Sequence, residues 1–136
     1  SQPLTLAVRI YFDRRCFMSI TILKKETEIN AALAVMSPIA AEAARLLAHR
    51  IKEDTSIIQD KTGEKFQNEV FQVIGISCAR NGIRPIDGNP QFENFIEHNV
   101  HSIMNIGLSM AMIKPKNGIL MKAALVGLGL VTGIGF

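Results

Sequence analysis

The sequence predicts a mainly α-helical protein with three to four amphipathic helices, a candidate N-terminal β-hairpin and a hydrophobic, Gly-rich C-terminal segment. Three observations predict this class. Apolar residues recur at spacings of three and four through the middle of the chain, they alternate with other residues from position 4 to position 12, and charge is absent from position 123 onward. The 136 residues therefore divide into 1–23, 24–113 and 119–136.

The amino-acid composition excludes some classes of protein and of function. Hydrophobic residues make up 48% of the chain and charged residues 20%, which are values of a folded protein rather than a disordered one. The net charge is +3, and the basic residues are scattered instead of forming a stripe. Nucleic-acid binding would need a basic helix or stacking aromatic residues, so we expect no nucleic-acid partner.

The N-terminal region 1–23 has two interpretations. Every second residue is a large apolar one in the first half of this region, which is typical of a half-buried strand: Leu4, Leu6, Val8, Ile10 and Phe12. A second strand is expected over Met18–Leu23, with residues 13–16 as the turn of a β-hairpin. Alternatively, Arg14-Arg15 can be encoded as AGG-AGG two codons before an ATG for Met18. This would be a bacterial ribosome-binding sequence, and residues 1–17 would then be a translated leader.

The first two helices are expected on either side of Ser37-Pro38. Good helix formers fill 26–36, and serine followed by proline is a favoured helix start. From there a stripe recurs at helical spacing: Ile39, Ala43, Leu46, Leu47, Ile51 and, if the helix continues, Ile58. The polar side of this helix is expected to carry Glu42, Arg45, His49, Lys52 and Glu53.

Two further helices follow. Residues 60–63 form a turn, and a helix is expected over Glu64–Arg80 with a buried stripe of Phe66, Val70, Val73, Ile74 and Ser77 or Cys78. Asn81-Gly82 suits the left-handed conformation that ends a helix. Asn89-Pro90 repeats the cap-plus-proline start, and the last helix is expected to run until Lys114-Pro115 stops it.

The segment 119–136 differs from the rest. Its 18 residues would span about 27 Å as a helix, close to the hydrocarbon thickness of a bilayer of about 30 Å. Lys114 and Lys116 precede it, and Lys122 lies one turn inside, where a long side chain can reach the headgroups. Lysines on one side favour a cytoplasmic position for that side. The segment is therefore a candidate membrane-inserted helix with the helical domain in the cytoplasm.

Glycines within this segment suggest self-association. Gly129 and Gly133 lie four residues apart, the spacing that lets two helices approach closely in lipid. The alternative is a buried element of a cytoplasmic protein, either a helix or a strand, because short apolar runs cannot be assigned by periodicity alone. We expect a homo-oligomer or a protein partner in either case.

The sequence contains no motif that indicates a catalytic or metal-binding site. His98 and His101 lie three apart, but the order Glu-His-Asn-Val-His is not the zinc-protease order, and a solvated polar face explains it better. Cys78 lies in an apolar helical stripe, which indicates a buried structural cysteine. We therefore expect no catalytic residue, cofactor or metal, while enzymatic activity stays open.

The sequence thus predicts a small non-enzymatic, membrane-associated protein. Its helical domain would be tethered by 119–136 and would act by oligomerising or by binding a partner at the bilayer. A ribosome-binding sequence within the reading frame would fit a bacterial, phage or plasmid gene. The alternative function is a soluble helical interaction module or subunit whose C-terminal segment is buried in a core or an interface.

Overall fold

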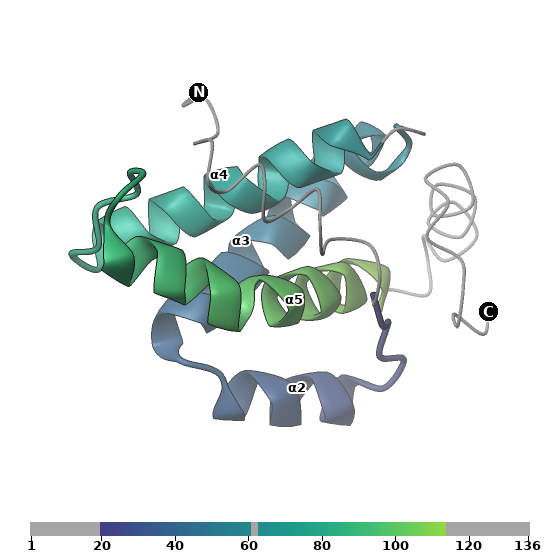
Figure 1. The fold of residues 1–136 in the computed structure, drawn as a ribbon. Helices are drawn as coiled ribbons and strands as arrows, with labels where there is room; N and C mark the ends of the chain where they lie inside the picture. Colours follow the sequence, from purple (N-terminus) through teal and green to yellow (C-terminus); the bar gives the residue numbers. More distant parts are fainter. Residues whose placement is uncertain (1–19, 61–62, 114–136) are drawn as a thin grey trace.

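A computed structural model describes residues 20–60 and 63–113. These ranges hold four α-helices and one 3-10 helix: α2 (Glu26–Val35), α3 (Pro38–Glu53), η1 (Thr55–Ile58), α4 (Glu64–Arg80) and α5 (Pro90–Met112) (Figure 1). The mainly helical class is therefore confirmed for this part of the chain. The segment 119–136 and the first expected strand lie outside the described residues.

Helix starts follow from local capping chemistry. The hydroxyl oxygen of Ser37 accepts a hydrogen bond from the backbone N–H of Ala40 at 3.2 Å, and Pro38 is the first residue of α3. At the start of α5, Oδ1 of Asn89 accepts a hydrogen bond from the backbone N–H of Gln91 at 3.2 Å, and Pro90 is the first residue of the helix. Such caps are worth about 1 kcal/mol each, because they satisfy donors that the helix itself leaves unpaired.

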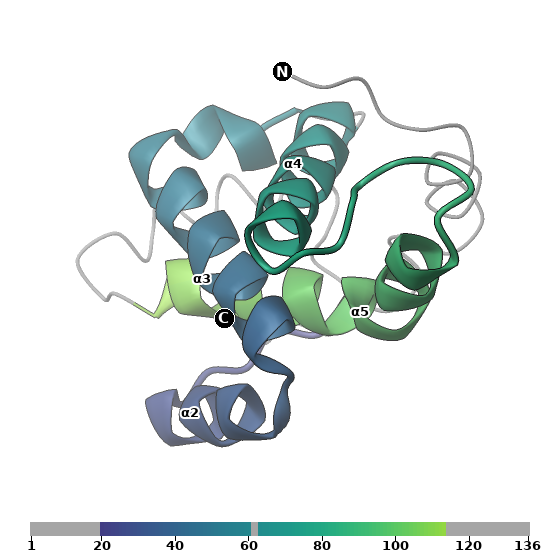
Figure 2. The same cartoon turned by 90° about the vertical axis from the view of Figure 1, so that its left-hand side faces the viewer.

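The helices are arranged around α3. It crosses α5, with which it makes the most extensive helix–helix contact, and it also packs against α4, whereas α2 lies to one side and touches α5 (Figures 1 and 2). The chain turns from α4 to α5 through a loop in which Gly82 and Gly88 have φ of +82° and +83°, a region that glycine adopts without strain. The expected end of α4 at Asn81-Gly82 is thereby confirmed.

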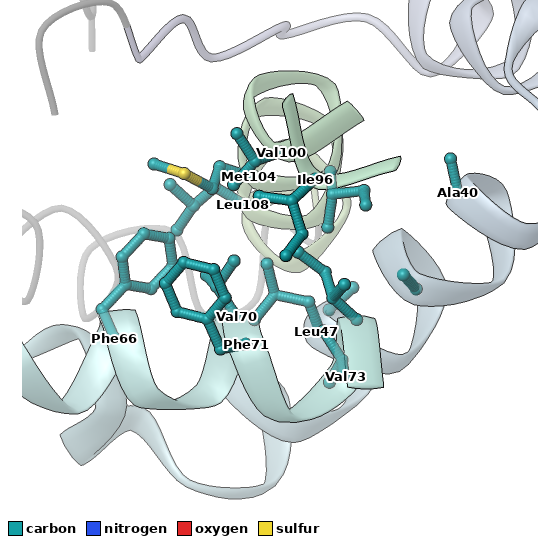
Figure 3. Packing of buried hydrophobic residues seen from close by; sticks show 14 of the residues in the cluster. Ala40, Leu47, Phe66, Val70, Phe71, Val73, Ile96, Val100, Met104 and Leu108 are labelled. Carbon is teal, nitrogen blue, oxygen red and sulfur yellow. The ribbon is translucent and has the colours of Figure 1, made fainter. Parts of the chain in front are cut away.

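The main core lies between α3, α4 and α5 (Figure 3). Large side chains from all three helices are fully buried in it: Leu47, Ile51, Phe66, Val70, Ile74, Ile103, Met104 and Leu108. Each large apolar side chain buried in this way contributes about 1.5–3 kcal/mol. The stripe expected on α4 is confirmed, with Phe71 buried in addition.

A glycine permits a close approach between α3 and α5. Gly107 is buried in α5, and a Cβ atom there would lie 2.6 Å from Cδ2 of Leu47 and 3.0 Å from its Cγ. Leu47 is itself fully buried, so it has little room to move. The absence of a side chain at position 107 therefore sets how closely the two helices pack.

Two details of the expected second helix need correction. The helix does not continue to Ile58: α3 ends at Glu53, and Oδ1 of Asp54 accepts from the N–H of Ser56 at 3.0 Å to start η1. Ile58 still reaches the core, fully buried, from this 3-10 turn. Glu42, expected on the solvent side, instead faces α4, where its carboxylate meets Arg80 and Ser77.

Residues 20–25, which we call the strap, connect the N-terminal region to α2. They carry no strand, so the described end of the second expected strand, 20–23, is not part of a β-sheet here. The rest of the expected hairpin lies outside the described residues. In place of a strand partner, the strap follows α5 (Figure 2).

Candidate interaction surface

The residues that the sequence singles out all follow α5. Lys114, Lys116, Lys122, Gly129 and Gly133 lie beyond position 113 and thus outside the described residues. What the structure describes is the part of the helical domain from which they continue. This is the end of α5 at Met112 together with the strap and α2.

Two hydrogen bonds fix the strap to α5. The backbone N–H of Thr21 donates to Oδ1 of Asn105 at 3.0 Å, and the N–H of Leu23 donates to the hydroxyl of Ser109 at 2.8 Å. Ser109 in turn donates to the carbonyl oxygen of Asn105 at 2.6 Å, and its side chain is fully buried. The polar residues of α5 thus satisfy backbone groups of a segment more than 80 positions away in the sequence.

These bonds also give the direction of the strap. Moving from Thr21 to Leu23 advances an extended chain by about 6.6 Å, and moving from Asn105 to Ser109 advances a helix by about 6 Å. The strap therefore runs in the same direction as α5. Lys25, at the end of the strap, has an extended backbone (φ −104°, ψ 133°).

Beneath the strap, α2 closes a small second cluster. Only three of its members are buried, one each from α2, α3 and α5: Ile29, Ala44 and Ile106. More hydrophobic side chains line it while remaining partly exposed: Leu23, Ala32, Leu33, Met36, Met110 and Ile113. This cluster is consequently half open to solvent at the C-terminal end of α5.

The opposite face of α2 is exposed and carries three apolar residues beside polar ones. Ala31, Ala34 and Val35 point away from the small cluster, and Val35 is 87% exposed. Because α2 contributes one buried residue, Ile29, it is held by less apolar burial than the other helices. We refer to Ala31, Ala34 and Val35 as the α2 outer face.

Charged groups elsewhere join helices. Arg50 on α3 donates to Oε1 of Glu69 and to Oε1 of Gln72, both on α4, at 2.9 Å. Near the C-terminal end of α4, Arg80 donates a hydrogen bond to the carboxylate of Glu42 on α3 at 2.9 Å. This bond, together with one from the hydroxyl of Ser77, holds the pKa of Glu42 below its ordinary value. Each of these side chains bonds to the neighbouring helix, which accounts for its place in the fold.

The structure also describes the surroundings of His98 and Cys78, the residues that the sequence offered as candidates for metal binding or catalysis. Nδ1 of His98 lies 2.8 Å from the carbonyl oxygen of Asn94, one turn earlier on α5. Over residues 20–60 and 63–113, no three histidine, cysteine or acidic side chains converge in a way that could hold a metal ion. Cys78 is fully buried, and burial raises the pKa of its thiol to about 11. A thiol in that state is a poor nucleophile near neutral pH.

Two further findings concern membrane-spanning helices and similarity to known proteins. Among α2 to α5, none combines the length and hydropathy needed to cross a bilayer. Comparison with protein-family models, with curated proteins and with solved structures finds no match to this chain.

Sequence reasoning missed the attachment of the strap to α5. The sequence signal for it is two polar residues, Asn105 and Ser109, within an otherwise apolar helical stretch.

Proposed function

We propose that this protein is a small, non-enzymatic, membrane-associated protein, with its helical domain on the cytoplasmic side, tethered by 119–136. The single observation that carries the proposal is the composition of that segment. It is 18 residues long, has one charge, Lys122, near its start, and follows the basic residues Lys114 and Lys116. The domain would act by oligomerising or by offering the α2 outer face to a protein partner.

A charge placed within the segment tests this proposal. Leu128→Arg should shift the full chain from the membrane fraction to the soluble or aggregated fraction after alkaline washing, because arginine at the centre of a spanning helix costs about 2.5–3.5 kcal/mol. Leu128→Ile keeps the volume and is the matched control. Recovery of the unmodified full chain in the soluble fraction without detergent would contradict the proposal.

One observation favours a second candidate function, a soluble helical interaction module. The small cluster is half open where α5 ends, with Met110 and Ile113 partly exposed. An apolar segment such as 119–136, from the same chain or a partner, would complete it. Under this function Leu128→Arg lowers the melting temperature of a soluble protein, whereas under the first it leaves the melting of the helical domain nearly unchanged.

A further inference from the structure

We propose that Asn81 is a site of spontaneous deamidation, which its contact with Glu42 holds back while α3 and α4 are packed together. Asn81 is followed by Gly82, and both residues are exposed at the C-terminal end of α4. Glycine places no side chain beside its backbone nitrogen, so this nitrogen can approach the carboxamide of the preceding asparagine. The inference concerns the α3–α4 pair and does not depend on the proposed function.

The reaction consumes only water. The backbone nitrogen of Gly82 attacks Cγ of Asn81 and forms a C–N bond, while the bond from Cγ to Nδ2 breaks. The leaving nitrogen takes up the proton of the attacking N–H and departs as ammonia. Water then opens the cyclic imide at either of its carbonyl groups. One product is aspartate, and the other is isoaspartate, whose main chain is longer by a methylene group.

In the folded protein the carboxamide of Asn81 is bonded to the preceding turn of α4 and to α3. Nδ2 donates to the carbonyl oxygen of Ser77 at 2.7 Å and to Oε1 of Glu42 at 3.2 Å. We call these two hydrogen bonds the clasp. The N–H of Gly82 is also bonded, to the carbonyl oxygen of Ala79 at 3.3 Å. Formation of the imide therefore requires the clasp and the bond of Gly82 to open.

Glu42 is fixed in position for its part in the clasp. Its Oε2 accepts a hydrogen bond from Arg80 at 2.9 Å, and the hydroxyl of Ser77 donates to its Oε1 at 3.0 Å. Both donors belong to α4, whereas Glu42 belongs to α3. The clasp consequently links the reactivity of Asn81 to the packing of the two helices.

The aspartate product cannot rebuild the clasp. A carboxylate at position 81 has no N–H to donate, and its oxygens would face the carbonyl oxygen of Ser77 and the carboxylate of Glu42, which are both acceptors. The new charge would also lie at the C-terminal end of α4, where the helix dipole disfavours negative charge. Deamidation should therefore weaken the α3–α4 contact at this end.

The isoaspartate product disturbs the backbone as well. Two hydrogen bonds close the end of α4, from the N–H of Gly82 to the carbonyl oxygen of Ala79 and from the N–H of Ile83 to that of Cys78. The extra methylene group lies in the main chain just before both donors and shifts them relative to their acceptors. Ile83 is buried, so this shift also reaches the main core.

The first experiment measures deamidation of the full chain at mildly alkaline pH by peptide mass spectrometry, with isoaspartate detected by enzymatic methylation. At Asn81 the reaction should be slower by about tenfold or more in the native protein than in urea, because it requires local opening. Asn89 is an internal control: Pro90 follows it and has no N–H, so Asn89 should stay intact in both states.

Variants of Glu42 test its control of the rate. Glu42→Ala removes the acceptor on α3 and should raise the native rate at Asn81 by about two- to tenfold, the range expected for one lost hydrogen bond. Glu42→Gln keeps an Oε1 acceptor and should raise it less. Glu69→Gln is the matched control, because it removes the salt bridge to Arg50 elsewhere between the same helices and should leave the rate unchanged.

A further variant tests the product. Asn81→Asp should lower the melting temperature of the full chain by a few degrees. Glu42→Gln should also lower it in the unmodified chain, since the salt bridge to Arg80 is lost. In the Asn81→Asp background it should instead raise it, because it removes one of two facing carboxylates and supplies an N–H donor. Asn81→Ser adds no charge and should not reverse the sign.

Several results would contradict the proposal. An Asn81 that stays intact in urea is not a deamidation site. Equal rates in the native and unfolded chain, or equal effects of Glu42→Ala and Glu69→Gln, would show that the clasp does not control the reaction. If Asn81→Asp leaves the melting temperature unchanged, or if Glu42→Gln lowers it in that background too, the product does not break the clasp.

Discussion

Replacing Gly107 by alanine tests the close contact between α3 and α5 at Leu47. The added methyl group would sit 2.6 Å from Cδ2 of Leu47, 3.0 Å from its Cγ and 3.1 Å from its Cβ. Cδ2 and Cγ can move only if the side chain of Leu47 rotates within a packed core, and Cβ can move only with the backbone of α3. Overpacking of this kind costs about 1–3 kcal/mol, and alanine returns about 1 kcal/mol in helix propensity. We expect a net destabilisation of about 1 kcal/mol.

A second glycine isolates the steric part of this cost. Gly75 lies within α4, and a Cβ atom there would be 3.8 Å from Cβ of Pro85, an ordinary contact. Gly75→Ala should therefore stabilise the protein by up to about 1 kcal/mol. The difference between the two glycine-to-alanine variants, about 1–3 kcal/mol, measures the steric conflict alone. Urea denaturation of the full chain, followed by far-ultraviolet circular dichroism, gives both values.

Removing the side chain of Leu47 should reverse the sign of the effect of Gly107→Ala on the free energy of unfolding. Leu47→Ala by itself should cost about 2–5 kcal/mol, because it leaves a cavity in the main core. In that background Gly107→Ala should stabilise, since its methyl group fills part of the space, and the coupling free energy should be about 1–3 kcal/mol. If Gly107→Ala has the same effect with and without Leu47, or matches Gly75→Ala, the close contact does not limit the packing.

Further predictions concern Glu42, Cys78 and the glycines of the segment 119–136. Glu42→Gln should make the free energy of unfolding less dependent on pH in acid. The lowered pKa of Glu42 in the folded protein contributes stability that is complete above its unfolded pKa of about 4.3, and this stability is lost as the pH falls through the folded pKa. Unfolding titrations at several acidic pH values measure this loss. Cys78 should resist iodoacetamide at pH 8 in the native protein and react after denaturation, as peptide mass spectrometry would show, since it is buried with a pKa of about 11. Gly129→Ile or Gly133→Ile should reduce oligomer size in detergent, whereas Leu128→Ile should not, because close helix approach depends on the small residues.

Helix boundaries were predictable because they depend on neighbours in the sequence. Ser37-Pro38 and Asn89-Pro90 carry both the capping side chain and the favoured first residue, and the structure starts α3 and α5 there. Gly82 marks the end of α4 for an equally local reason, its positive φ. The apolar stripe of α4 was read correctly because a single face of that helix is buried.

Features that depend on distant partners were not predictable from the sequence. Glu42 was assigned to solvent because its apolar neighbours lie on the other side of α3, yet the face it occupies is covered by α4. The role of Gly107 has no local signal in the sequence, because it depends on the contact with Leu47 of α3. The attachment of the strap to α5 likewise depends on hydrogen bonds between residues more than 80 positions apart.

The strap also fixes the order in which the domain can be completed during synthesis. Leu23 leaves the ribosome 86 residues ahead of Ser109, its hydrogen-bond partner. At about 5–20 residues per second, roughly 4–17 s pass before that partner exists. Throughout this interval α2 lacks the helix that covers Ile29, and the N–H groups of the strap bond to water. The last turns of α5 thus provide the closing contact of the domain.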